Sequence, residues 1–165
     1  MIAVIQRVRQ ASVTVENKVI AHINRGLVIL LGVAQGDTGQ DVSFMVEKIP
    51  RLRIFPETHG KMTDALQDIN GELLVISQFT LLASTEKGRR PSFELAAPPE
   101  EARMRYHETL EQFQALGLSV QAGIFGATMV VNLENDGPMP LILDSRAGKG
   151  VKKVKNLLHQ ADRHT

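Results

Sequence analysis

Polar side chains gather at the end of one apolar run, and they are the first candidates for chemistry in this sequence. Residues 73–76 are all apolar and include β-branched members, which is typical of a buried strand. Ser77, Gln78 and Thr80 follow at once, so two hydroxyls and a carboxamide stand where the strand ends. A buried polar group is unfavourable unless it is hydrogen-bonded. This strand end is therefore either a satisfied turn or a binding site.

The hydroxyl of Thr80 is a candidate nucleophile that lacks an activating base nearby in the sequence. A hydroxyl becomes a good nucleophile only beside a group that takes its proton. No histidine lies close in the sequence, and Glu86 and Lys87 fall in an expected loop. From the residues alone, a structural and a catalytic role for Ser77 and Thr80 stay equally open.

Composition excludes several other kinds of site. The chain has no cysteine, so it has no disulfides, thiolate nucleophiles or thiolate metal ligands. Its five histidines do not have the spacing of metal ligands, and no glycine-rich phosphate loop occurs. We therefore expect neither a metal ion nor a cofactor.

Basic residues are concentrated in two places. Lys87, Arg89 and Arg90 surround Gly88 in a segment that is by default a solvated loop, and its rigid ending at Pro91 adds some weight to an anion-binding role. Residues 146–165 hold six basic residues and one Asp, so their net charge is +5. Because the whole chain has a net charge of +1, residues 1–145 carry −4. A polyanionic partner would thus be bound by local patches.

The elements that must position these residues form one domain. The 165 residues, 43% of them hydrophobic, are enough for a single core. Hydrophobic patterns predict two helices, near 39–51 with Asp37 or Thr38 as the cap and from 98 to about 116. They also predict strands at 2–8, 11–15, 19–23, 27–33, 53–55, 73–76, 120–123, 127–133 and 139–143. Strands at both ends favour an α+β fold with largely antiparallel pairing.

Seven short motifs carry a family resemblance. They are Leu-Arg-Ile-Phe at 52–55, Gly-Lys-Met at 60–62, Ser-Gln-Phe-Thr-Leu at 77–81, Lys-Gly-Arg-Arg-Pro-Ser-Phe at 87–93, Gly-Ile-Phe-Gly-Ala at 123–127, Asn-Asp-Gly-Pro at 135–138 and Leu-Asp-Ser at 143–145. In this order they resemble the bacterial D-aminoacyl-tRNA deacylase family. The resemblance implies one domain over residues 1–146, with a barrel-like core and two main helices, in a homodimer. Residues 147–165 are left as a basic tail, either a short helix or disordered.

The resemblance implies a tRNA-editing hydrolase. Such an enzyme cleaves the ester between a D-amino acid and the 3′-terminal adenosine of tRNA, at sites on the interface of a homodimer. It needs no cofactor and no membrane, and we expect a cytoplasmic protein because the sequence has neither a signal peptide nor a membrane-spanning run. The residues implied to line the catalytic pocket are Ser77, Gln78, Phe79 and Thr80, and those expected to contact tRNA are Lys87, Arg89 and Arg90.

Chiral selectivity is implied to reside in the pair Gly137–Pro138. The resemblance makes this bond cis, places the pair in the pocket of the other subunit and gives Arg7 the task of supporting the loop. Two parallel carbonyls against the α-carbon would block an L side chain without touching a D side chain. Glycine has no Cβ and passes the same filter, so glycyl-tRNA mischarged on tRNA(Ala) is an expected second substrate.

The implied chemistry uses the substrate's own ribose. A free ribose hydroxyl beside the ester is thought to assist the attack, while backbone N–H groups of Phe79 and Thr80 bind the developing oxyanion. Ser77 and Gln78 would contact the ribose and base, or the α-amino group. Thr80 as a nucleophile is the less favoured assignment.

One departure from the family pattern leaves two other interpretations open. Where the family usually continues with Val-Thr after Asn-Asp-Gly-Pro, this chain has Met139–Pro140. A proline is tolerated there only at a sheet edge, and its presence predicts weaker chiral selectivity or a weaker dimer. The chain could then be a catalytically impaired tRNA-binding homologue, or a Thr80-dependent hydrolase of another small ester or amide.

Overall fold

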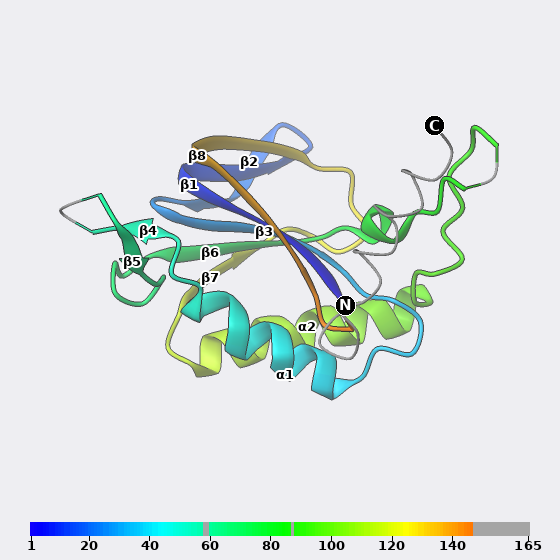
Figure 1. Cartoon of the computed structure of the whole chain (residues 1–165). Helices are drawn as coiled ribbons and strands as arrows, with labels where there is room; N and C mark the ends of the chain where they lie inside the picture. The colour runs from blue at the N-terminus through cyan, green and yellow to red at the C-terminus, as the bar shows by residue number, and fades with distance from the viewer. Residues whose placement is uncertain (58–59, 87, 147–165) are drawn as a thin grey trace, which may run out of the picture.

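A curled, mixed β-sheet forms the body of the molecule. The computed structural model describes residues 1–57, 60–86 and 88–146 (Figure 1). In chain order the elements are β1 (Ile2–Val15), β2 (Lys18–Ile23), β3 (Gly26–Gly32), α1 (Gly39–Lys48), η1 (Ile49–Arg51), β4 (Phe55–Pro56), β5 (Met62–Asp64), β6 (Glu72–Ser77), η2 (Phe79–Leu82), α2 (Pro99–Ala115), β7 (Ser119–Ala122) and β8 (Val130–Asp144), with η1 and η2 as 3-10 helices. The α+β class and the two main helices are confirmed.

The sheet runs in the order β2-β1-β3-β6-β7, and β8 pairs with β1. β1 is antiparallel to β2, β3 and β8. β3–β6 and β6–β7 are parallel pairs, which the sequence patterns do not reveal. β1 is also one continuous strand where two were predicted: its first half pairs with β3 and its second half with β2, while β8 pairs along both halves. This change of partners curls the sheet so that it nearly closes into a barrel.

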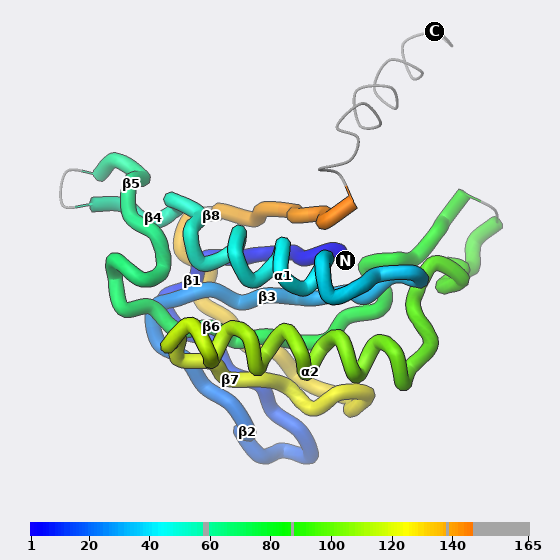
Figure 2. The backbone as a smooth tube through the Cα atoms, turned by 90° about the horizontal axis from the view of Figure 1, so that it is seen from below, coloured from blue at the N-terminus to red at the C-terminus, as the bar shows by residue number. Residues whose placement is uncertain are grey.

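Two apolar clusters stabilise the curled sheet. The larger lies between one face of the sheet and the helices, and it includes Ile5, Ile29 and Phe113, each fully buried. α1 and α2 lie side by side across this face (Figure 2). The smaller cluster lies inside the curl, where Val13 and Ile23 meet Ile76. None of the helices in the described ranges is long and apolar enough to cross a membrane.

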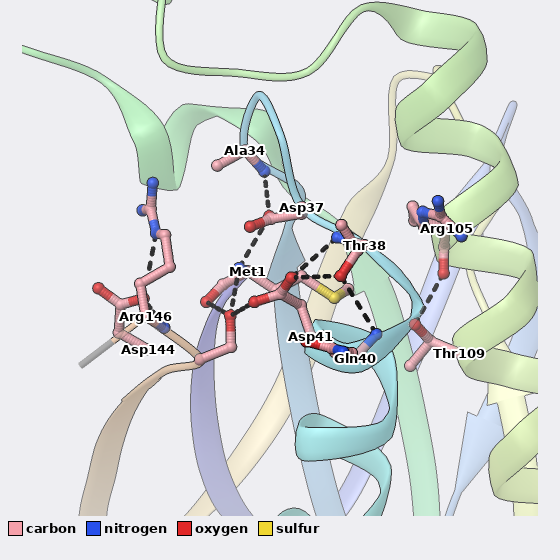
Figure 3. Close-up of polar contacts among 11 residues, drawn as sticks. Met1, Ala34, Asp37, Thr38, Gln40, Asp41, Arg105, Thr109, Asp144 and Arg146 are labelled. Carbon is pink, nitrogen blue, oxygen red and sulfur yellow. Dashed lines mark hydrogen bonds and ion pairs between the residues drawn. The ribbon is translucent and has the colours of Figure 1, made fainter. Parts of the chain in front are cut away.

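The first helix begins with a capping box. The Thr38 hydroxyl accepts a hydrogen bond from the Gln40 N–H at 3.3 Å, and the Thr38 N–H donates to the Asp41 carboxylate at 2.8 Å. Of the two predicted caps, Thr38 is therefore the one used. Asp37 has a different role, because its carboxylate is 2.7 Å from the α-ammonium group of Met1 and accepts the Ala34 N–H at 2.6 Å (Figure 3).

The same network ties both ends of the described chain to α1. The Met1 ammonium group donates to the Ser145 hydroxyl at 2.6 Å, and that hydroxyl donates to Asp41 at 2.7 Å. Burial raises the pKa of Asp41, but the hydrogen bonds from Ser145 and Thr38 and the charge of the Met1 ammonium group outweigh it, so the pKa lies below its ordinary value. The contacts therefore favour an ionised Asp41.

Candidate active site

An apolar cavity of about 450 Å³ opens at the end of β6. Its walls come from segments that are far apart in sequence: the ends of β3 and β6, the start of α2, the loop after β7 and the start of β8. The lining residues are Val33, Ile76, Ser77, Gln78, Phe79, Ala96, Ala97, Pro99, Ala102, Phe125, Gly126, Ala127, Met129 and Val131. The volume and the mainly apolar lining suit a small organic ligand with few polar anchors.

The predicted strand end lies at the rim of this cavity. Gln78 continues the sheet ladder by donating its N–H to the Leu31 carbonyl at 2.8 Å, and the chain then turns into η2. The Gln78 carboxamide donates to the Thr80 hydroxyl. Ser77 and Gln78 are half-buried, whereas 54% of Phe79 is exposed. The structure thus brings Ser77, Gln78 and Phe79 into the cavity lining and joins Thr80 to them by a hydrogen bond.

The start of η2 offers backbone donors to a ligand. In a 3-10 helix each N–H bonds to the carbonyl three residues earlier, so the N–H groups of the first residues have no acceptor within the helix. In η2 these residues are Phe79 and Thr80, while the later Ala83 N–H donates to the Thr80 carbonyl at 3.1 Å. Two adjacent backbone donors at a cavity rim are suited to binding an oxyanion.

Much of the cavity wall consists of small residues that the sequence did not single out. Ala96 pairs with Ala34 in a β-bridge, and the Ala97 N–H donates to the Val33 carbonyl at 2.9 Å. Isolated alanines carry no sequence signal for a site. The opposite wall includes Phe125 and Gly126, for which the only signal was their place in a family motif.

The pair Gly137–Pro138 lies in a bulge of β8. Gln6 of β1 pairs with Pro140 and Val8 pairs with Asn135, so residues 136–139 lie opposite Arg7 alone. The predicted turn is therefore an interruption within one long strand. A Cβ at Gly137 would lie 2.4 Å from the Met139 nitrogen, so the bulge requires glycine at this position.

Arg7 anchors this bulge from within the sheet. Only 6% of the residue is exposed. Its Nε donates to the Asp136 carbonyl at 2.8 Å and lies 3.3 Å from the Asp136 carboxylate, and its Nη1 donates to the Ile54 carbonyl. The Arg9 Nε is 3.6 Å from the other carboxylate oxygen of Asp136. The predicted strand 2–8 would place Arg7 near its end, but β1 continues to Val15, so Arg7 lies in the middle of the strand.

Within one chain the bulge is remote from the cavity. Arg7 is level with Leu73 of β6 through the register of β3, and Ser77 lies four residues further along β6. β8 and β6 are separated by β1 and β3. At about 3.3 Å per residue and about 4.8 Å per strand, the separation is roughly 13 Å along the sheet and 14 Å across it. One subunit alone therefore does not bring the two predicted parts of the site together.

The basic loop is connected to the site through an aromatic contact. Ser84 and Ser92 exchange backbone hydrogen bonds of 2.8 and 2.9 Å, which close the loop that carries the exposed Arg89 and Arg90. The Phe93 ring then meets the Phe79 ring edge to face, with centroids 4.9 Å apart. Lys87, the third predicted tRNA contact, lies outside the described residues, as does the whole tail from residue 147.

The departure at Met139–Pro140 is accommodated by the sheet. In the described part of the chain β8 pairs only with β1, so it is an edge strand that tolerates a missing N–H. Pro140 is exposed, and Met139 packs against the larger core.

Solved structures share this architecture. The chain superposes on one titled "c-Myc DNA Unwinding Element Binding Protein" with a TM-score of 0.83 and 42% identity, over 87% of this chain and 98% of that one. A probable eukaryotic D-amino acid tRNA deacylase shares the fold with a TM-score of 0.75 at 16% identity, over the same shares of each chain. The chain is therefore a single α+β domain with the fold that both structures share.

Sequence comparison is more specific. The family model described as D-Tyr-tRNA(Tyr) deacylase matches residues 4–144, and the chain belongs to this family. A D-aminoacyl-tRNA deacylase from Sulfurihydrogenibium sp. (strain YO3AOP1) is 53% identical over 88% of this chain and 99% of its own length. One from Roseiflexus castenholzii (strain DSM 13941 / HLO8) is 54% identical over 88% of this chain and 92% of its own length. The family resemblance of the sequence motifs is thereby confirmed.

Proposed function

We propose that this protein hydrolyses the ester between a D-amino acid and the terminal adenosine of tRNA. The observation that carries the proposal is the apolar cavity that ends at Ser77–Thr80, with the backbone donors of η2 at its rim. An adenine ring and an amino acid side chain both suit apolar walls. The N–H groups of Phe79 and Thr80 are placed to bind the ester oxygen as negative charge develops on it.

The protein supplies position and hydrogen-bond donors, and the substrate supplies the activating group. Among the described residues, the hydrogen-bond partner of the Thr80 hydroxyl is the Gln78 carboxamide, which is not a base of the kind that serine hydrolases use. A ribose hydroxyl next to the ester needs only to be held in place. Thr80 therefore orients Gln78 towards the ribose, and the alternative of a Thr80-dependent hydrolase is disfavoured.

The active form is a homodimer in which Gly137–Pro138, with a cis bond, enters the partner's cavity. The separation of the bulge from the cavity of its own chain supports this arrangement. An apolar row also lies on the sheet face away from the helices, formed by the cross-strand neighbours Leu30, Val4 and Ile142. Ile142 is 77% exposed in the single chain, as expected for a surface that a partner covers.

The bulge is the chiral filter in this proposal. Its backbone carbonyls, held by Arg7 behind them, exclude an L side chain and admit a D side chain or the hydrogen of glycine. The ester of glycine mischarged on tRNA(Ala) is therefore a second substrate. Arg89, Arg90 and Lys87 contribute contacts to the tRNA backbone.

Ester loss measured on three substrates tests the proposal. D-tyrosyl-tRNA and glycyl-tRNA should be deacylated, and L-tyrosyl-tRNA should be spared. Binding of all three without turnover would instead identify a catalytically impaired tRNA-binding homologue, the interpretation that Met139–Pro140 raised. Sedimentation of the same samples measures the oligomeric state. A monomer that retains chiral selectivity would refute a filter supplied by the partner subunit.

A further inference from the structure

Two nearby arginines on α2 have different partners: Arg103 lies over an aromatic ring, whereas Arg105 forms an ion pair. The guanidinium carbon of Arg103 lies 5.2 Å from the centroid of the Phe125 ring. Arg105, two residues further on, is instead paired with Glu108 at 2.8 Å. Within residues 1–57, 60–86 and 88–146, Arg103 forms no ion pair with a carboxylate. An arginine stacked on a ring keeps its in-plane N–H donors available for an anion.

Arg103 is fixed at the rim of the cavity. Phe125 is part of the cavity wall, and so is Ala102, the residue before Arg103. The Phe125 ring also packs against Tyr106, with centroids 5.8 Å apart, and the Tyr106 hydroxyl donates to the Val75 carbonyl of β6 at 2.9 Å. Burial raises the pKa of Tyr106, so this hydroxyl remains a donor near neutral pH. Phe125 and Tyr106 thus connect the exposed guanidinium group of Arg103 to β6, the strand that ends at Ser77.

We propose that Arg103 binds the phosphodiester that joins the terminal adenosine of the tRNA to the preceding nucleotide. This inference rests on the proposed function, in which the terminal nucleoside occupies the cavity and its 5′-phosphate emerges at the rim. A guanidinium group presents two parallel donors to a phosphate, and the Phe125 ring sets their plane in advance. Arg103 would then act in binding and leave the chemical step to residues 77–80.

An acidic neighbour of Arg103 provides a variant that should change the KM for tRNA in the opposite direction. Glu100 is exposed and lies one helical turn before Arg103 on the same side of α2. Its charge opposes a phosphate bound there. Replacing it in the variant Glu100→Gln should therefore lower the KM for tRNA, whereas Arg103→Gln should raise it.

Substrates that differ by one phosphate provide the test. The wild type, Arg103→Gln, Arg103→Lys and the control Arg51→Gln, an exposed arginine on η1, are compared on D-tyrosyl-tRNA, on the 3′-D-tyrosyl ester of adenosine and on the same ester of adenosine 5′-phosphate. For Arg103→Gln we expect a rise of about tenfold in the KM for tRNA with little change in kcat, because one charge-assisted contact is lost. The slope of log KM against log salt should fall by about one unit. Arg103→Lys should recover part of the affinity, and Arg51→Gln should match the wild type.

The nucleoside esters show whether the phosphate is what Arg103 recognises. The wild type should prefer the phosphorylated ester, and Arg103→Gln should remove this preference without changing hydrolysis of the unphosphorylated one. Equal losses on both esters would show that Arg103 only supports the cavity wall, and an unchanged KM for tRNA would also overturn the inference. If the wild type hydrolyses none of the esters, the proposed function fails. Arg103 is then tested by binding of a tRNA 3′-end oligonucleotide with an amide-linked D-tyrosine, where equal affinity of wild type and Arg103→Gln refutes the contact.

Discussion

The two parts of the proposed site are held in place by different physical means. At the cavity, the Gln78 N–H continues the sheet ladder to Leu31, and the groups offered to the ligand are backbone donors of η2. At the bulge, residues 136–139 leave the ladder, and the buried side chain of Arg7 holds Asp136 through its backbone carbonyl and its carboxylate. Side-chain changes should therefore be tolerated better at the cavity rim than behind the bulge.

The largest effect is expected at Arg7. Arg7→Lys keeps the charge but cannot reach both the Asp136 and the Ile54 carbonyls, because a lysine has no planar fork. The bulge should lose its fixed orientation, and we expect hydrolysis of L-tyrosyl-tRNA to rise about tenfold or more together with a loss of about 2 kcal/mol in the free energy of unfolding. Competition kinetics on D- and L-tyrosyl-tRNA and urea denaturation measure the two effects. Unchanged selectivity in a folded Arg7→Lys variant would show that the bulge is held without the guanidinium group.

A methyl group at residue 137 tests the bulge without changing its charges. In Gly137→Ala the new Cβ would lie 2.4 Å from the Met139 nitrogen, so the backbone of the bulge must move. We expect reduced discrimination between D- and L-tyrosyl-tRNA while the sheet stays folded, because the interruption is local. Gly117→Ala is a suitable control, since this glycine lies outside both parts of the site and a methyl group added there would have no atom within 4 Å, although its φ of +77° adds some strain of its own. Full selectivity in the Gly137→Ala enzyme would show that the backbone of the bulge is not the chiral filter.

A smaller effect is expected at the cavity rim. Thr80→Ala removes a hydroxyl that accepts from Gln78 but leaves the backbone donors of η2 in place. We expect kcat to fall by less than about tenfold, whereas removal of a true nucleophile costs several orders of magnitude. Single-turnover kinetics and mass spectrometry of quenched wild-type enzyme check this. Abolished turnover together with a trapped acyl-enzyme would make Thr80 the nucleophile.

The same contrast explains which features the sequence could predict. Local signals were sufficient for the strand that ends at Ser77 and for the start of α2 at Pro99, and they narrowed the cap of α1 to Asp37 or Thr38, because each depends on residues adjacent in the chain. The parallel pairs and the curl depend on which strands meet in space, which periodicity does not encode. Cavity-lining alanines carry no chemical signal. The role of Arg7 emerged only through family resemblance, since an arginine within a strand more often indicates an exposed face.

The smallest effect is expected in the N-terminal network of Met1, Ser145 and Asp41. Like the support of the bulge, this network uses buried polar contacts. The pKa of Asp41 lies below its ordinary value when the protein is folded, so ionised Asp41 contributes stability above that value, and this contribution is lost as pH falls through the folded pKa. Asp41→Asn should cost about 1 kcal/mol near pH 7, the usual effect of losing a helix-capping contact. The difference between wild type and variant should shrink below about pH 4. Thermal unfolding of both proteins from pH 7 to pH 3 measures it, and a difference that stays constant across this range would mean that the contact acts through the shape of the side chain and not through its charge.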